Sequence, residues 1–542
     1  MTLRALAVTV LVVAPLAWLA ATWTSRQAAE AERLASGRLE DGTWLEPGTT
    51  AAQAAAFGGT LTEGGIPPIA AHPPPGAVLP ESFPPPRFQW KDEYASRTYE
   101  VVLSGPGDRV VFRGITTERE LRPPAATWDT VRASPGVYSW RVRGALVDPA
   151  GRVIGEASSS ESAQLTVAPK AENPTGLILF GQKLRPPERP TGTVPLLMMH
   201  LEVQALDLER MEHRGFFRSS TGHARTVRHP ERARRDQADP TEPTTTQCVS
   251  CHAASTDGRY LAMFSQEAEE SPPGFDAPNG FLTLLAMPER RVLKQLPHAF
   301  MPAFNPVDHH LVAFGTVDET IGAKDQQMVR KSDLQVLDIK TGEVRDVPGA
   351  NLPDRVENFP MWSPDGKLLT FIRTKEGEIW HGAQGHIDVA AIPYNGGAGG
   401  TAVDVLGAAQ NGKSNYLPIY SPDGRWIVFT QANQGFFSQE SADLMIVSSA
   451  GGEARRLACS SANADSWHRF SPDGRWLAVV SNREDIRRPH IYLGRFDTQK
   501  GECSPAVQMP VVAGPGAHTH AFSWTPRFDW ITDYPLVARL RE

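Results

Sequence analysis

The stretch FPMWSPDGKLLTFIR, residues 359–373, places an aromatic-rich run and an apolar run on either side of Ser-Pro-Asp-Gly. The flanking runs are rich in residues that favour β-strands. Within the four central residues, Gly supplies a positive φ and Asp caps the turn. The stretch therefore predicts two strands joined by a tight turn. Two further clear copies are LPIYSPDGRWIVFTQ, residues 417–431, and WHRFSPDGRWLAVVS, residues 467–481.

Three weaker copies extend the repeat in both directions. They are CHAASTDGRYLAMFS at 251–265, MPAFNPVDHHLVAFG at 301–315 and AFSWTPRFDWITDYP at 521–535. The residues that open the six turns are Ser255, Asn305, Ser363, Ser421, Ser471 and Thr525, spaced by 50 to 58 residues. A repeat of this length with several strands per unit is typical of a β-propeller. We therefore predict an all-β fold with a six-bladed propeller over residues 170–542.

The last copy lies close to the C-terminus, so its blade needs strands from elsewhere. The segment TVPLLMMHLEVQALDLERMEHRGFF, residues 193–217, precedes the first copy and has the pattern of two blade strands. We expect it to close the ring against the C-terminal strand, which removes exposed sheet edges.

The Ser-Pro-Asp-Gly copies resemble the PD40 repeats of the TolB-like six-bladed propellers, over residues 175–540. Two copies depart from the pattern, with NPVD at Asn305 and TPRF at Thr525. The resemblance implies a propeller whose channel face recruits a protein partner.

The remaining sequence indicates an exported, multidomain protein. The 542 residues include 46 Pro and 46 Gly. The net charge of -7 argues against nucleic-acid binding.

Residues 1–26 predict a signal peptide or a single membrane anchor, with an apolar run over residues 5–23. Both alternatives place the chain in the periplasm or another extracytoplasmic space. Residues 27–80 are rich in Pro, Ala and Gly and predict a linker.

Residues 81–169 show short alternating strands. Trp90 precedes a strand over residues 99–103, and Tyr138, Trp140 and Val142 share one face of a later strand. The pattern resembles a fibronectin type III or immunoglobulin-like sandwich. Without cysteines in this segment, its core would depend on Trp90, Trp140 and the aliphatic alternation.

CVSCH, residues 248–252, matches the attachment motif for c-type haem. Cys248 and Cys251 would form thioether bonds to one haem, and His252 would be the proximal iron ligand. The alternatives are a disulfide or a partial zinc site, but zinc would need two further ligands, and none lies close in sequence beyond His252.

The repeat alignment places this motif on an inner strand. His252 stands three residues before its turn, in register with Pro302, Pro360, Pro418 and His468. Inner strands line the central channel of a propeller, so the motif would attach a haem at the channel mouth.

The sixth ligand of the iron should come from the neighbouring strands of blades two and six. His298 and His518 stand in register with Cys248, and Met301 and His520 lie on the same two strands. A Met ligand would raise the reduction potential and a His ligand would lower it, whereas an open position would bind small molecules. Cys459 and Cys503 bracket the fifth blade and are candidates for a disulfide in an oxidising compartment, with two free thiols as the alternative.

We therefore predict an exported monohaem c-type cytochrome that exchanges electrons with a redox protein or membrane complex. One alternative is a haem enzyme for a small nitrogen oxide or peroxide. The arrangement resembles the haem-bearing propeller domain of the hydrazine synthase alpha subunit, which carries several haems where this chain has one motif. The other alternative is a TolB-like protein-binding propeller in which the haem is secondary.

Overall fold

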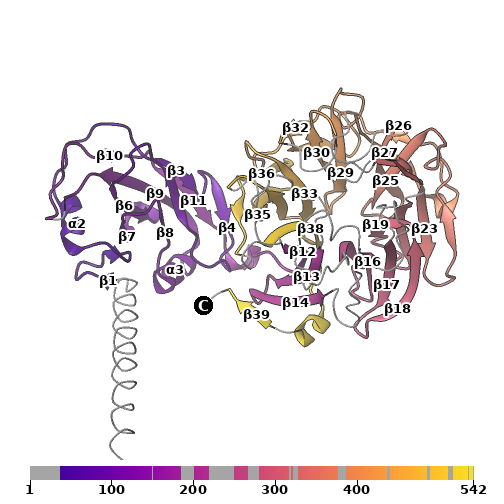
Figure 1. Ribbon diagram of the computed structural model, residues 1–542, viewed down its shortest axis with the longest axis horizontal. Helices are drawn as coiled ribbons and strands as arrows, with labels where there is room; N and C mark the ends of the chain where they lie inside the picture. Colours follow the sequence, from indigo (N-terminus) through magenta and orange to yellow (C-terminus); the bar gives the residue numbers. More distant parts are fainter. Residues whose placement is uncertain are drawn as a thin grey trace, which may run out of the picture. The chain divides into compact units, whose positions relative to one another are not determined.

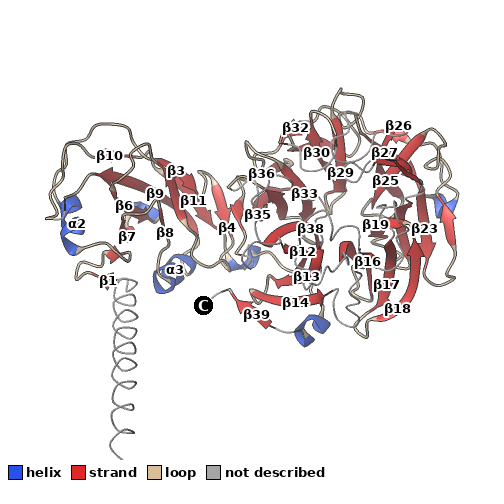
Figure 2. Cartoon of the chain, in the orientation of Figure 1, coloured by secondary structure: helices blue, strands red, loops and turns tan. Residues whose placement is uncertain are grey.

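The computed structural model describes residues 37–148, 150–184, 200–218, 249–266, 280–316, 319–321, 328–375, 386–435, 440–484, 489–510, 517–534 and 536–540. They form two compact units. The first comprises residues up to Gly76 and Pro85–Val167, and the second comprises Ala77–Pro84 and Ala168–Glu542. Strands dominate both units (Figure 2), which confirms the all-β prediction.

Two sheets build the first unit. The smaller has the order β3 (Ile69–His72), β5 (Phe88–Lys91), β8 (Glu120–Leu121). The larger has the order β1 (Gly37–Arg38), β2 (Trp44–Leu45), β7 (Val110–Thr116), β6 (Thr98–Ser104), β9 (Gly136–Ala145), β11 (Ala163–Val167), and β10 (Ser158–Ser159) pairs with β9. Two short helices, α2 (Ala51–Ala55) and α3 (Ala125–Arg132), accompany the sheets.

Aromatic side chains join the two sheets. Phe88 on β5 meets Trp140 on β9 edge to face at 5.0 Å between ring centroids, and Trp90 meets Tyr99 on β6 at 5.1 Å. All four rings are buried. Alternation along the strands places these large apolar groups on the inner faces, where burial stabilises the sandwich. The fibronectin type III assignment of residues 81–169 stays a prediction.

The predicted linker over residues 27–80 has to be corrected from residue 37 onward. β2 runs parallel to β7, with Trp44 opposite Gly114, and β3 pairs antiparallel with β5. The Pro-rich and Ala-rich composition concealed these strands because each spans two to four residues and shows no alternating pattern. The segment therefore extends the sandwich.

Six antiparallel sheets build the described part of the second unit (Figure 1). Blade one contains β15 (Val249–Ala254), β16 (Tyr260–Gln266), β17 (Gly280–Ala286) and β18 (Arg291–Pro297). Blade two contains β19 (Ala299–Phe304), β20 (Leu311–Thr316), β23 (Leu334–Asp338) and β24 (Val344–Asp346), with a separate hairpin of β21 (Glu319–Ile321) and β22 (Met328–Lys331). Blade three contains β25 (Arg355–Trp362), β26 (Leu368–Lys375), β27 (Asp388–Pro393) and β28 (Val403–Asp404). Blade four contains β29 (Ser414–Tyr420), β30 (Trp426–Ala432), β31 (Asp443–Ser448) and β32 (Arg455–Arg456).

The fifth and sixth blades complete the ring. Blade five contains β33 (Asp465–Phe470), β34 (Trp476–Ser481), β35 (His490–Asp497), β36 (Glu502–Cys503) and β37 (Val507–Gln508). Blade six contains β38 (Ala517–Thr525), β12 (Leu177–Leu184), β13 (His200–Asp207), β14 (Glu212–Arg218) and β39 (Leu536–Arg539). The inner strands β15, β19, β25, β29, β33 and β38 contact one another in this order, and β38 returns to contact β15. The chain therefore folds as a six-bladed β-propeller.

The ring closes in blade six, as predicted, but the predicted segment is not the one that pairs with the C-terminal inner strand. In blade six β38 pairs with β12, placing Leu177 opposite Thr525, and β13 and β14 follow. Figure 1 shows β38 beside strands from the start of this unit. The predicted segment begins at residue 193, after β12, and therefore supplies only the outer strands.

The turn chemistry explains why the repeat is so regular. In the third blade Ser363 Oγ donates to Asp365 Oδ1 at 2.6 Å, and the Leu368 amide donates to Ser363 Oγ at 2.9 Å. The following Gly366 has a φ of 70°, which a residue with a Cβ adopts only with strain. In the NPVD copy the Asn305 side chain replaces Ser and Asp together, accepting from two backbone amides at 2.9 Å.

The structure leaves the membrane prediction untested. Among the described residues, no helix has the length and the apolar character needed to cross a bilayer. The apolar segment over residues 5–23 lies outside them.

Candidate functional site

The imidazole of His252 is held on the inner strand of blade one. The residue lies on β15 and is 7% exposed. Its Nδ1 lies 2.8 Å from Ser523 Oγ on β38, the inner strand of the adjacent blade six. This hydrogen bond fixes the orientation of the ring and leaves Nε2 as the nitrogen that would ligate iron.

A backbone irregularity recurs at one position of the inner strands. In blades two to five the residue four before the turn has a positive φ, between 42° and 55°, and a shift in strand register accompanies it. The four residues are Met301, Phe359, Leu417 and Trp467. A bulge of this kind re-aims one side chain out of the normal strand alternation. Each of these blades thereby contributes one large apolar side chain at the same level of the channel. We call this set the bulge ring.

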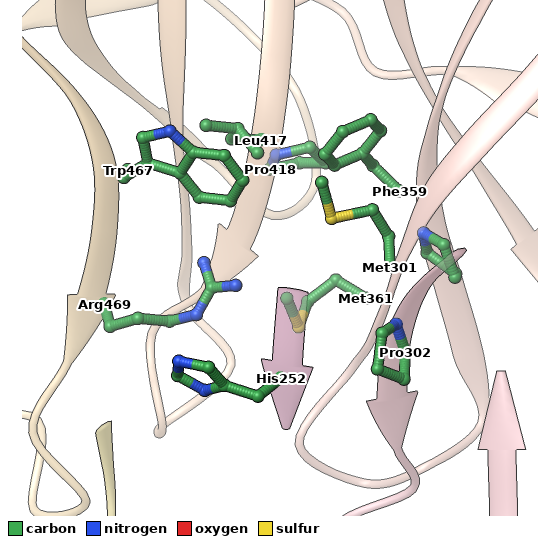
Figure 3. A pocket seen from close by; sticks show the side chains of 10 residues that line it. His252, Met301, Pro302, Phe359, Met361, Leu417, Pro418, Trp467 and Arg469 are labelled. Carbon is green, nitrogen blue, oxygen red and sulfur yellow. The ribbon is translucent and has the colours of Figure 1, made fainter. Parts of the chain in front are cut away.

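The bulge ring and His252 line one cavity (Figure 3). The space between these residues that is free of protein atoms measures about 460 Å³, including open solvent. The other lining residues are Pro302, Pro360, Met361, Pro418 and Arg469. A concave, mostly apolar space with a few polar groups is the usual form of a binding site for a cofactor or small molecule.

The lining residues fit a c-type haem. His252 offers an oriented imidazole, and the aromatic rings, aliphatic groups and prolines suit an apolar macrocycle. Met301 and Met361 offer thioether sulfurs, and the guanidinium of Arg469 suits a carboxylate. None of the described lining residues carries a carboxylate group. In the described part of the chain no group of three or more His, Cys, Asp or Glu side chains could hold a metal ion.

The structure brings some of the predicted haem residues together. Cys248 lies outside the described residues, and Cys251 is placed by its backbone alone, at the register shift of β15. Met301 is 8% exposed and lines the cavity, whereas His298 is exposed just before β19. His518 and His520 lie on β38, opposite Lys183 and Gly181, and are likewise placed by their backbone. The predicted flanking of β15 by blades two and six is confirmed.

Of the positions aligned with His252, three line the cavity and one does not. Pro302, Pro360 and Pro418 contribute to the lining, but His468 is fully buried and its Nε2 lies 3.1 Å from the Val428 carbonyl oxygen. Burial lowers the pKa of His468 to about 3, so the imidazole is neutral. In β33 His468 is paired with Val479 and the register shift spans Trp467 alone, whereas the shifts in β19, β25 and β29 span the aligned proline as well. The two neighbours of His468 line the cavity instead.

Those neighbours, Trp467 and Arg469, and the third-blade Met361 were missed by the sequence analysis. They stand four or two residues before their turns, whereas the positions predicted to align with His252 stand three before. The recurrence of large apolar residues four before the turn was the available signal. In a strand with strict alternation, adjacent side chains point to opposite faces of the sheet. Alternation alone therefore does not predict that adjacent residues line one cavity, as they do at a bulge.

Cys459, between blades four and five, and Cys503 of blade five are buried side by side. Both are free thiols in the structure, within an apolar cluster that blades four and five share. A Cβ added to Gly494 would lie 2.5 Å from Cys503 Sγ and 3.2 Å from Cys459 Cβ, so both side chains face this glycine. Burial raises the pKa of the Cys503 thiol, and Cys459 raises it further. The disulfide stays a prediction.

Comparisons with known proteins add the following similarities. No family model matches the chain. It is 26% identical over 197 residues to the uncharacterized peptidase YuxL of Bacillus subtilis (strain 168), covering 30% of this chain and only 27% of that relative. TolB from Acinetobacter baumannii aligns with a TM-score of 0.41 and 13% identity over 75% of this chain and 86% of its own. TolB from Agrobacterium tumefaciens aligns with a TM-score of 0.33 and 20% identity over 52% and 92%.

Proposed function

We propose that this protein is an exported propeller that carries one covalently attached haem c and transfers electrons to or from a partner redox protein. The observation that carries the proposal is His252, whose imidazole borders an apolar cavity while its Nδ1 is bonded to Ser523. The Cys-x-x-Cys sequence directly before this histidine supports covalent attachment.

Each residue has a distinct task in this proposal. Cys248 and Cys251 would hold the porphyrin through thioether bonds, and His252 would ligate its iron. Ser523 would accept from Nδ1–H and hold the imidazole in the tautomer that presents Nε2. The apolar side chains of the bulge ring would limit contact of the haem with water, which would tune the reduction potential. The haem, when bound, supplies one-electron oxidation and reduction.

The proposed compartment follows from the same motif and from the N-terminus. Covalent haem attachment fits the extracytoplasmic location that residues 1–26 predict, whether they are cleaved or retained as an anchor. The partner is then a soluble redox protein or a membrane complex in that compartment.

Attachment is tested directly by expressing the full chain with a c-type maturation system. We expect haem-stained protein after denaturing electrophoresis and a reversible reduced-minus-oxidised spectrum. The variant Cys248→Ala/Cys251→Ala should lose the stain, whereas Cys459→Ala/Cys503→Ala should keep it. Colourless, fully matured wild-type protein with both motif thiols open to alkylation would refute the proposal.

The fold supports a second candidate, a protein-binding propeller in which the haem is secondary. The closed ring and the Ser-Pro-Asp-Gly copies support it. If the protein is a binding propeller, His252→Ala should still bind a partner that the wild-type chain captures. If it transfers electrons, His252→Ala should lose electron exchange with that partner. A haem enzyme is distinguished by binding of carbon monoxide or nitrite to wild-type protein.

A further inference from the structure

The bulge ring combines one left-handed backbone conformation with four different side chains. Its members are Phe359, Leu417 and Trp467, which cannot ligate iron, and Met301, which can through its thioether sulfur. The left-handed backbone is shared by all four, with φ values of 54° at Met301 and 53° at Leu417. The left-handed conformation is therefore a property that blades two to five share. Among the four residues that adopt it, the methionine is the one in blade two.

Met301 is also the member of the bulge ring in the blade next to the haem motif. Its strand β19 contacts β15, which carries His252. In β15 the register shift lies between Ser250 and Ala253, so Cys251 occupies the position that Met301 occupies in β19. The backbone position of Cys251 in β15 and that of Met301 in β19 are therefore equivalent points of adjacent inner strands.

We propose that Met301 is the sixth ligand of the haem iron, an inference that rests on the proposed function. Three observations favour it over the other candidates. Met301 lines the same cavity as His252, its side chain is 8% exposed, and Figure 3 shows both side chains at that cavity. His298 is exposed at the entrance of the same strand, outside the residues that line the cavity. His518 and His520 lie on the other flank, on β38.

Met361 is the competing thioether. It also lines the cavity, but it lies on β25, which belongs to blade three, and outside the bulge position. Substitution of each methionine in turn therefore serves as the control for the other.

Met301→Leu is the appropriate variant because Leu417 shows that leucine is accommodated at this position with the same φ. The side-chain volume is nearly conserved, so folding should be retained. In haem-stained protein we expect Met301→Leu to lose the charge-transfer band of sulfur-ligated ferric haem, to lower the midpoint potential and to gain carbon monoxide binding. Met361→Leu should keep the charge-transfer band, and His298→Ala should leave all three properties unchanged.

The outcomes separate this inference from the proposed function. Wild-type protein without attached haem would refute both. Haem-bearing Met301→Leu with a wild-type spectrum and potential would refute only the ligand assignment. If Met361→Leu loses the charge-transfer band and Met301→Leu keeps it, the sixth ligand is Met361 of blade three. That result would also refute Met301 as the ligand.

Discussion

His252 Nδ1 lies 2.8 Å from Ser523 Oγ, although the two residues are 271 positions apart in the chain. The contact joins the inner strands of the first and last blades, across the point where the ring closes. It therefore links closure of the propeller to the orientation of the candidate iron ligand.

Ser523→Ala should raise the midpoint potential of the haem-bearing protein. The Ser523 oxygen, by accepting from Nδ1–H, makes the imidazole a stronger donor to ferric iron. Its loss should destabilise the ferric form, which a spectroelectrochemical titration would measure. Ser523→Thr keeps the hydroxyl group and should stay close to wild type. Equal potentials for all three proteins would show that the hydrogen bond does not act on the iron.

Gly366→Ala should destabilise the protein more than Gly424→Ala. Both glycines occupy the same turn position, with φ values of 70° and 73°, so each substitution incurs about 1–2 kcal/mol of backbone strain. At Gly366 a Cβ would also lie 2.5 Å from Asn305 Oδ1, whereas at Gly424 the nearest atom is 3.9 Å away. Asn305 is hydrogen-bonded to the Gly366 carbonyl and cannot easily withdraw. We expect a further loss of about 1–3 kcal/mol, measured by urea unfolding. Equal losses would contradict this explanation.

Arg483→Ala should weaken blade five severely. Asp465 is fully buried, and its Oδ1 lies 3.1 Å from Arg483 Nη2. Arg483 also stacks over the Tyr492 ring, 4.2 Å from the centroid. Removing the guanidinium leaves a buried carboxylate without its ion-pair partner, which typically lowers the free energy of unfolding by about 3–5 kcal/mol.

The exposed pair of Lys340 and Asp308, 4.0 Å apart, provides the control for that variant. Lys340→Ala should lower the free energy of unfolding by less than about 1 kcal/mol. A comparable loss in both variants would show that burial of the Arg483 pair does not determine its contribution.

Glu357→Gln should stabilise the protein at neutral pH and leave it nearly unchanged near pH 4. Burial raises the pKa of Glu357 to about 7 from an unfolded value of 4.5. Between these values the unfolded chain releases the proton while the folded chain retains it, so wild-type stability falls as pH rises. The difference approaches about 3 kcal/mol above pH 7. Denaturant unfolding at pH 4.5, 6 and 7.5 measures it, and parallel pH profiles of the two proteins would contradict the assignment.

Cys459 and Cys503 should be oxidised to a disulfide in protein purified from an oxidising compartment. Their side chains meet at Gly494, and the bond would join the connection between blades four and five to β36 of blade five. We expect no alkylation of either thiol before reduction, and a loss of about 2–4 kcal/mol in Cys503→Ser. Alkylation of both thiols in denatured, unreduced protein would show that they stay free.

The repeat made the blades predictable, because each Ser-Pro-Asp-Gly turn carries its own chemistry. Ser363, Asp365 and Gly366 act within one turn, so their roles can be inferred from local spacing. The early strands β1 to β3 were missed because they are too short to show alternation. The bulge ring was missed because the period of a strand does not reveal where its register shifts.

The sequence by itself determined the six-bladed propeller and the position of the CVSCH motif on the first inner strand. Both follow from the period of the repeat and from turn chemistry between residues near in the chain. The tertiary structure decided which side chains share the cavity, bringing Ser523 to His252 and Met301, Trp467 and Arg469 to the same space. Which side chains share the cavity depends on ring closure and on bulges that redirect side chains. Both arise only when the blades pack together.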